Sequence, residues 1–519
     1  MVRRTSLQVA KDRAETLAYR LQAEQAKVQL EAMKRSYDAA KVSSLHPRRG
    51  DSKSGNSVMQ HANSKIRNMA RYLDENHDLA IGILDDLVNK TVGAELSYQP
   101  MIKNKDGSLH VRANEVVRAL HREWENKKPE SSRSIPWNQT RRMACRSWFR
   151  DGEILVQHLE GNAPIQHLSK VPYSIELIEA DYLPFDLFNA NKNKTSGNND
   201  VVHGIEINGW KQAQYFHLYK NHPGDVFSIH KNIDFDTKRV AAENITHLKF
   251  VRRFDQLRGV SIFHGILQRL DDIKDYEESE RIAARVAAAL TGFIKKSADF
   301  ANQNTSEIGQ RMLEMNPGMI FDNLAPGEEI GTIGSDRPNS GLQDFRNSQL
   351  RACAAGTGSS YSSISNDYNG TYSSQRQEMV ENIPAYAAAR NYFVDMFDRE
   401  CDRRFIDMAL LSGLVPLAGV DLDSIYDADY GSVSIPWIDP LKEAKASKEL
   451  IDSNIKSRHQ IIRDHGGDPA LVDKQIQADY FYEKEQKQLE EEKKKALSDQ
   501  GDEEKEDENK PKKDEEVAA

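Results

Sequence analysis

The feature that most constrains the fold of this chain is one long stripe of apolar residues between Ile262 and Ile294. Its members follow one another at steps of three and four, the spacing of one helix face: Leu267, Leu270, Ile273, Tyr276, Ile282, Val286 and Leu290. The opposite face carries a run of acids, Asp271, Asp272, Asp275, Glu277, Glu278 and Glu280. The pattern predicts one continuous helix, and such a helix needs partners that cover its apolar stripe.

Helical patterns also dominate the rest of the chain. Residues 5–40 have helix-forming composition without Gly or Pro, and a second periodic segment predicts a helix over 64–92 that ends at Gly93. Further helices are expected at 112–127, at 137–153 and at 342–355. Another should begin at a capping box formed by Ser374 and Gln377, run to about 411 and have a kink at Pro384. Two more are expected after Pro440, separated by 465–469.

Between Ile154 and Phe250 the pattern changes to short alternating runs, which predict the strands of a modest sheet. Proline-glycine pairs after residue 296 indicate turns that join short strands. The Gly/Ser/Tyr/Asn stretch 356–374 is predicted to be a flexible loop, too polar to form a core element. The fold class that follows is α+β and predominantly helical.

Length and composition describe a folded protein of two or three domains, because 38% of the 519 residues are hydrophobic. There is no run of about 18 uncharged apolar residues and no apolar core of a secretory signal near the start, so we expect neither membrane insertion nor export. The three cysteines lie far apart and are expected to be reduced thiols. The net charge of −9 argues against a protein that grips nucleic acid through a basic surplus.

No pattern of a catalytic site stands out. The sequence has no P-loop, HExxH or GxSxG motif, and its histidines do not pair at metal-ligand spacing. The acids between 271 and 280 are compatible with the metal ligands of a nuclease, but a solvated helix face is the usual role of such a run. We therefore expect no catalytic residue, no metal and no cofactor.

Several groups of residues between 65 and 485 resemble, in their order, the lambda-type portal proteins of tailed bacteriophages. The most specific is Gln256-Leu257-Arg258-Gly259, immediately before the long helix. The others are the helix end at 85–93, Arg150-Asp151-Gly152-Glu153, Ile178-Glu179-Ala180-Asp181, Gly204-Ile205-Glu206, the two Pro-Gly pairs at 317–318 and 326–327, a run from Leu350 to Tyr372, Ser374 and Arg376, and Trp437-Ile438-Asp439-Pro440.

The resemblance implies a portal fold that assembles as a ring, usually of about twelve identical copies. Carried over to this sequence, the family's regions are a helical arm (1–59), wing (60–258), stem helix (259–296), clip (297–341), second stem helix (342–356), channel loop (357–374), returning wing helix (375–435), crown (436–485) and disordered charged tail (486–519). In such a ring, neighbouring copies cover the apolar stripe of the long helix through a heterologous interface.

A channel for moving DNA also gives the charges a use. Acidic walls repel the phosphates and leave the duplex unanchored, so we expect Asp271, Asp272, Asp275 and Glu278 to face or approach the lumen. The alternative is that these acids only solvate the exterior of the ring. Loose guidance of DNA is expected from Lys295, Lys296 and Arg351, and contacts without sequence reading from Tyr361, Asn366, Tyr368 and Asn369.

The same resemblance implies the partners and the location. These are double-stranded DNA, the large subunit of a terminase that supplies the motor, major capsid and scaffolding proteins around the wing, and head-completion or adaptor proteins below the clip. The protein would be assembled in the cytoplasm of a host bacterium and reside at one vertex of the virion. Two alternatives stay open from sequence, another structural component of the virion and a metal-dependent nuclease.

Overall fold

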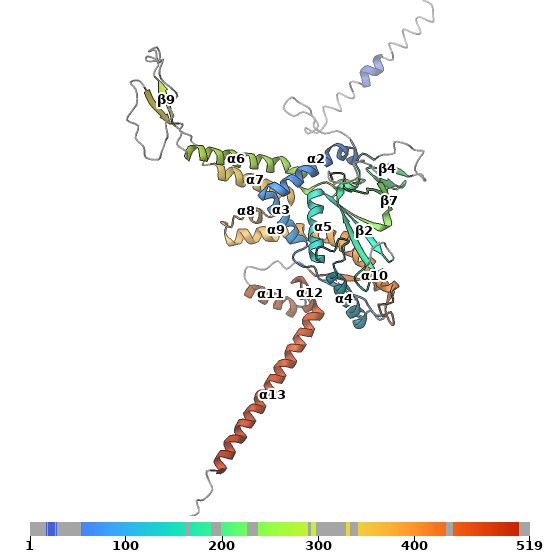
Figure 1. Ribbon diagram of the computed structural model, residues 1–519, viewed down its shortest axis with the longest axis vertical. Helices are drawn as coiled ribbons and strands as arrows, with labels where there is room; N and C mark the ends of the chain where they lie inside the picture. Colours follow the sequence, from blue (N-terminus) through green and yellow to red (C-terminus); the bar gives the residue numbers. More distant parts are fainter. Residues whose placement is uncertain are drawn as a thin grey trace, which may run out of the picture. The chain divides into compact units, whose positions relative to one another are not determined.

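The computed structural model describes residues 17, 19–25, 27, 53–161, 167–187, 199–225, 237–288, 292–296, 328–332, 341–431 and 440–507 (Figure 1). The chain divides into two units, Met1–Ser54 and Gly55–Ala519. In the first unit the described residues between 17 and 27 are helical, in agreement with the helix predicted over 5–40. The second unit contains all the elements that follow.

Two helices, α2 (Gly55–Asn76) and α3 (Asp78–Thr91), stand where one helix was predicted over 64–92. His77 separates them in an extended backbone conformation. Its ring Nδ1 accepts a hydrogen bond of 3.3 Å from the Leu79 amide, and its Nε2 lies 2.9 Å from the Leu270 carbonyl oxygen. The prediction of one helix was wrong because the spacing of apolar residues continues past His77 and gives no sign of the break there. The predicted end at Gly93 is confirmed, since Gly93 takes a left-handed φ of 70°.

The strand-rich middle of the chain forms two antiparallel sheets, where one was predicted. Between α3 and these sheets lie α4 (Val111–Asn126) and α5 (Trp137–Asp151), close to their predicted bounds. The first sheet has the order β3-β2-β8 and the second β4-β5-β6-β7. Their strands are β2 (Glu153–Glu160), β3 (Tyr173–Ile178), β4 (Asp200–Val202), β5 (Ile205–Ile207), β6 (Ala213–Tyr219), β7 (Thr237–Ala241) and β8 (Ile245–Lys249).

The long apolar stripe is divided between a helix and a strand. After a 3-10 turn (Ile262–Gly265), α6 runs over Leu267–Ala288, and 292–296 forms strand β9 (Gly292–Lys296). This strand pairs antiparallel with β10 (Glu328–Thr332), so the prediction of helix up to residue 294 was wrong. The turns predicted at the Pro-Gly pairs 317–318 and 326–327 lie outside the described residues. Helix α7 (Leu342–Thr357) packs along α6, as Figure 1 shows.

The segment predicted as a flexible loop is partly an ordered element. A short helix, α8 (Tyr361–Ser365), begins at the cap residue Ser360 and buries Ile364. Helix α9 (Tyr372–Phe393) then starts earlier than predicted, because Thr371 rather than Ser374 is its cap. Pro384 lies inside α9. A π-helical turn (Val394–Asp398) joins α9 to α10 (Arg399–Leu411), whose end matches the prediction.

Three helices, instead of the predicted two, follow Pro440. They are α11 (Pro440–Asp452), α12 (Arg458–Asp464) and α13 (Pro469–Asp507). Helix α13 extends into the segment 486–519 that was predicted to be disordered. The difference has a simple cause, because runs of Glu and Lys are good helix formers even where they bury nothing. Among the described residues, no helix combines the length and apolar character needed to cross a bilayer.

The main core lies where α4, α5, the first sheet and α10 meet. Trp124 stacks on Tyr173 at 5.6 Å between ring centroids and donates a hydrogen bond of 2.9 Å to the Tyr173 carbonyl oxygen. Phe405 of α10 packs on the same tryptophan at 5.5 Å. A short pair of strands closes this core, β1 (Tyr98–Pro100) with β11 (Ala428–Tyr430). The core therefore joins segments from opposite ends of the chain.

Candidate functional site

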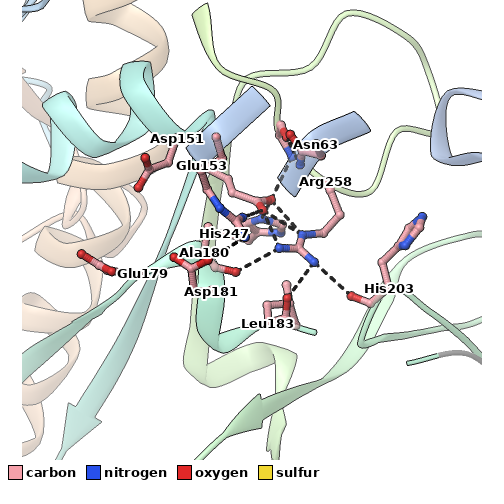
Figure 2. Close-up of polar contacts among 12 residues, drawn as sticks. Asn63, Asp151, Glu153, Glu179, Ala180, Asp181, Leu183, His203, His247 and Arg258 are labelled. Atoms are coloured by element: carbon pink, nitrogen blue, oxygen red, sulfur yellow. Dashed lines mark hydrogen bonds and ion pairs between the residues drawn. The ribbon is translucent and has the colours of Figure 1, made fainter. Parts of the chain in front are cut away.

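A buried polar cluster brings three of the sequence motifs into contact, and we call it the Arg258 hub. It consists of Asn63, Arg67, Glu153, Asp181, His247 and Arg258 (Figure 2). Arg258 comes from the segment before α6, Glu153 from the start of β2, and Asp181 from the turn after β3. Motifs that are more than 100 residues apart in sequence thus meet at one point.

Arg258 is fully buried and uses its whole guanidinium group. Its Nη2 lies 2.6 Å from Glu153 Oε1, and its Nε donates to the same oxygen at 2.8 Å. Its remaining donors reach three backbone carbonyl oxygens, those of Ala180 (3.1 Å), Leu183 (2.9 Å) and His203 (3.3 Å). A planar group with five donors is suited to such a junction, which a lysine could not reproduce.

Glu153 receives hydrogen bonds from three directions. Besides Arg258, its Oε2 accepts from the Gly259 amide at 2.8 Å and lies 3.0 Å from His247 Nε2. Burial alone would raise the pKa of Glu153, but the charge of Arg258 and the contact with His247 outweigh burial and hold that pKa well below its ordinary value. Burial likewise lowers the pKa of His247. The carboxylate is therefore ionised and fully engaged.

The two glycines beside these charges are in direct backbone contact. A Cβ placed on Gly259 would lie 1.9 Å from the Gly152 carbonyl oxygen, and a Cβ on Gly152 would lie 2.2 Å from the Val260 carbonyl carbon. Gly152 also has a left-handed φ of 86°. Only glycine fits at either position, because any side chain would push β2 away from the segment that leads into α6.

Ion pairs extend from Asp181 of the hub to residues around it. Arg67 donates to Asp181 at 2.7 Å, and Arg71 pairs with Asp151 at 2.8 Å and with Asp181 at 2.5 Å. The ligand atoms of Glu179, Asp181 and His222 lie within 4.8 Å of one another, a spacing that a metal ion would allow. Two arginines already balance the charge of Asp181, so the arrangement favours ion pairing over metal binding.

The remaining motif residues lie elsewhere. Gln256 is buried and donates to the Arg258 carbonyl oxygen at 2.8 Å, which shapes the turn before Gly259. Tyr372 opens α9, where Ser374 donates to the Thr371 carbonyl oxygen at 2.8 Å, and Arg376 is exposed. Pro440 is the first residue of α11, a position that suits proline because that amide has no helical acceptor. Asp439 lies outside the described residues.

The acids predicted to line a channel lie on α6. Asp272, Asp275 and Glu278 are exposed, and Asp271 is half-buried. Between them Lys274 donates to the Tyr72 hydroxyl of α2 at 3.0 Å. Glu277, on a neighbouring side of the helix, pairs with Arg346 of α7 at 2.8 Å. The structure thus places three of the four predicted acids together in solvent.

The predicted basic and polar contact residues fall into two groups. Lys295 and Lys296 lie on β9, in register with Glu329 and Glu328 of β10. The second group surrounds α8: the Arg351 guanidinium lies 5.1 Å from the centroid of the half-buried Tyr361 ring, whereas Asn366, Tyr368 and Asn369 are exposed. Tyr361 is therefore less available to a ligand than predicted.

Sequence reasoning missed the partners of the hub, Asn63, Arg67 and His247. A signal for the first two exists, because they occupy the face of α2 that also buries Met59, Ala70 and Leu73. Polar residues in such a stripe have to find buried partners. His247 gives no comparable signal, since any polar residue would fit the alternation of β8.

A comparison with known protein families identifies the chain. Residues 43–390 match the family described as "Phage portal protein, lambda family". A similar curated protein, "Probable portal protein" of Halomonas phage phiHAP-1, is 25% identical over 339 residues, which span 64% of this chain and 63% of that protein. The match therefore covers less than two thirds of the relative's own length.

Solved structures with some likeness belong to gene transfer agent (GTA) particles. One is titled "Virion of native gene transfer agent (GTA) particle" (10% identity, TM-score 0.38, 76% of this chain and 92% of that chain). Another is titled "Neck of native GTA particle computed with C12 symmetry" (12% identity, TM-score 0.37, 78% and 94%). At these TM-scores neither likeness bears on the fold. The match over 43–390 spans about two thirds of the sequence and includes the Arg258 hub, and so the chain belongs to the lambda family of phage portal proteins.

Proposed function

We propose that this chain is one subunit of a ring-shaped channel at a single vertex of a phage capsid, through which double-stranded DNA is packaged and ejected. The observation that carries the proposal is the family match over residues 43–390, which includes the hub and both helices α6 and α7. In this proposal the protein is a structural component of the virion and not an enzyme.

The exposed apolar residues at one end of the α6–α7 pair support assembly into a ring. Tyr276 and Phe345 meet edge to face at 5.0 Å between ring centroids, and Phe345 is 41% exposed. Further along α6, Ile282 is 52% exposed. An adjacent copy would cover these side chains in a head-to-tail interface, and repetition of that interface closes a ring. The copy number that the family favours is about twelve.

The charge of α6 supports the passage of DNA. Asp272, Asp275 and Glu278 are exposed along one helix. A wall of such carboxylates repels phosphates and keeps the duplex from binding statically. The polar residues Asn366, Tyr368 and Asn369 would touch the duplex without reading its sequence.

The partners follow from this role. The motor would be the large subunit of a terminase, docked near the clip segment 297–341. Capsid and scaffolding proteins would surround the wing, and head-completion or adaptor proteins would bind below the clip. The regions named wing, stem, clip, channel loop and crown keep their proposed bounds, except that the first stem helix is α6 (Leu267–Ala288). Assembly would take place in the cytoplasm of the host bacterium.

The first test is negative-stain imaging and mass determination of the purified full-length protein. The proposal expects a ring of about twelve copies with a central hole wide enough for duplex DNA. A uniform monomer or dimer at every salt concentration, together with a failure to restore packaging to a phage that lacks its portal gene, would contradict it.

A further inference from the structure

We propose that Asp86, Lys90 and Tyr386 are positioning residues that clamp the base of the channel loop, so that only its tip, 366–371, can yield to passing DNA. The inference rests on the proposed function, because it assigns the moving part of the same loop. It reverses the expectation from composition that the whole stretch 356–374 is flexible.

The base of the loop, 359–365, is a packed element. Ser360 is buried, and so is Ile364 on α8. The Ser360 side chain accepts a hydrogen bond from the Ser363 amide at 3.3 Å and thereby caps α8. A polar sequence can be buried in this way only if neighbouring elements satisfy its donors and acceptors.

Helix α9 supplies the first set of partners. The Tyr386 hydroxyl accepts a hydrogen bond from the Ser360 amide at 2.9 Å. Glu378 accepts two more, from Ser360 Oγ at 2.9 Å and from the Ser362 amide at 3.1 Å. The first turn of α8 is therefore bound to α9 through both its backbone and its side chains.

Helix α3 supplies the second set. Lys90 Nζ donates to Ser363 Oγ at 2.7 Å, lies 2.7 Å from Asp86 Oδ1, and donates to the Tyr386 hydroxyl at 3.3 Å. That hydroxyl in turn donates to Asp86 Oδ2 at 3.2 Å. Its single hydrogen and both lone pairs are thus in use, and Tyr386 joins the loop base to α3 and α9 at once.

The tip is held differently. Asn366 takes a left-handed φ of 51° and ends α8. The following bonds are local, from the Asn369 amide to Asp367 Oδ1 at 3.2 Å and from Gln375 Nε2 to the Tyr368 carbonyl oxygen at 2.6 Å. The Tyr368 side chain is 62% exposed. A few short-range bonds in solvent break far more easily than a buried network, so bending is confined to 366–371.

The deciding variant is Tyr386→Phe, which removes one hydroxyl and keeps the ring. In the assembled full-length protein we expect amide hydrogen exchange in 359–365 to accelerate on the order of tenfold to a hundredfold. The reason is that three hydrogen bonds of this hydroxyl are lost, and the one from the Ser360 amide is buried. The matched control is Tyr392→Phe, on the same helix, whose hydroxyl donates to the Lys249 carbonyl oxygen at 2.7 Å. It should leave exchange in the loop unchanged.

A milder second variant, Ser363→Ala, removes only the hydroxyl that accepts from Lys90 and leaves the contacts of Lys90 with Asp86 and Tyr386 in place. It serves as a second test in case Tyr386→Phe fails to fold. Packaging by heads built from Tyr386→Phe rings should fall while ring assembly, seen by imaging, stays intact. Unchanged exchange in 359–365 for both variants would overturn the clamp, and faster exchange with normal packaging would overturn its positioning role.

A separate measurement distinguishes failure of this inference from failure of the proposed function. A photo-crosslinking amino acid in place of Tyr368 should attach to duplex DNA in filled heads. If no crosslink to DNA forms, the assignment of a DNA channel to this loop fails, whereas the exchange data still decide whether the clamp exists.

Discussion

Gly259 and Gly152 fix the distance between β2 and the segment that enters α6, because their backbones touch. We predict that Gly259→Ala destabilises the protein by roughly 3 kcal/mol or more, since the new methyl would lie 1.9 Å from the Gly152 carbonyl oxygen. Chemical denaturation followed by circular dichroism measures the loss. Gly265→Ala is the matched control: a Cβ there meets nothing within 4 Å, and the change should stay within about 0.5 kcal/mol. Equal stability of both variants would contradict the contact.

His158 links stability to pH. Its Nδ1 lies 2.9 Å from the Tyr173 hydroxyl and its Nε2 2.9 Å from Thr246 Oγ1, and burial, aided by Arg404, lowers its pKa to about 4. Between that pKa and the ordinary value of 6.5 the unfolded chain binds a proton that the folded protein does not. The stability that this histidine contributes is therefore complete above pH 6.5 and is lost as the pH falls.

The matching prediction compares stability at pH 7 and pH 5. The wild type should lose about 2 kcal/mol more than His158→Asn over this range, because asparagine cannot take up the proton. Replacement of the exposed His61 by Asn should leave the pH dependence as it is. If His158→Asn shows the full wild-type dependence, the destabilising proton binds elsewhere.

At the same scale, the sequence predicts the importance of Arg258 but not its partners. Its spacing from Gln256 and Gly259 forms a motif that can be read directly. Its counter-ion Glu153 comes from β2, and a carbonyl acceptor comes from the turn after β3. The mutual approach of these segments is decided by sheet pairing and helix packing. No periodicity within one segment contains that information.

At the scale of elements, the helices were predictable, but some of their boundaries were not. The apolar period of α6 continues through Leu290 and Ile294, yet the backbone changes to strand at Gly292 because β10 offers an antiparallel partner. Pairing of β9 with a distant strand therefore decides the backbone conformation here, rather than the local spacing of apolar residues. The same reason explains α8, which composition describes as a loop but which contacts from α3 and α9 hold as a helix.

The docking of the C-terminal helices is mainly electrostatic. In α11 and α12 no residue is buried, and the start of α13 meets α4 through Lys474 with Glu115 (2.6 Å) and Asp468 with Arg118 (3.0 Å). The hydrogen bond from Lys474 lowers the pKa of Glu115. Salt screens the exposed pair of Lys474 with Glu115 strongly and the partly buried pair of Asp468 with Arg118 less. These helices should therefore detach at high ionic strength before the core unfolds.

A charge exchange tests this docking. Lys474→Glu should accelerate hydrogen exchange in α12 and in the first turns of α13 at low salt, because it places two acids side by side. The double variant Glu115→Lys with Lys474→Glu should restore protection, and about 0.5 M salt should abolish the difference between the variants. If protection from hydrogen exchange changes neither with these substitutions nor with salt, other contacts hold the helices.

For the whole molecule, the acids of α6 decide how DNA would move. We predict that Asp272→Lys with Asp275→Lys impairs packaging without preventing ring assembly, because cations in the channel would bind phosphates and act as a brake. Imaging reports assembly, and the DNA content of filled heads reports packaging. The control is Glu123→Lys on α4, a helix with no proposed role in the channel. Unaltered packaging by the double variant would place the acids on the exterior of the ring.

The pairing of β1 with β11 has a consequence for biosynthesis. Residues 98–100 leave the ribosome more than 300 residues before their partners at 428–430, and Tyr430 then donates to Asp402 beneath the main core. Until that late segment arrives, the edge of β1 and the Tyr98 ring that packs on Tyr430 have no cover. A nascent chain must therefore be kept from associating with its neighbours for most of its synthesis, and a nonsense codon anywhere before residue 428 would yield a product that cannot complete its core.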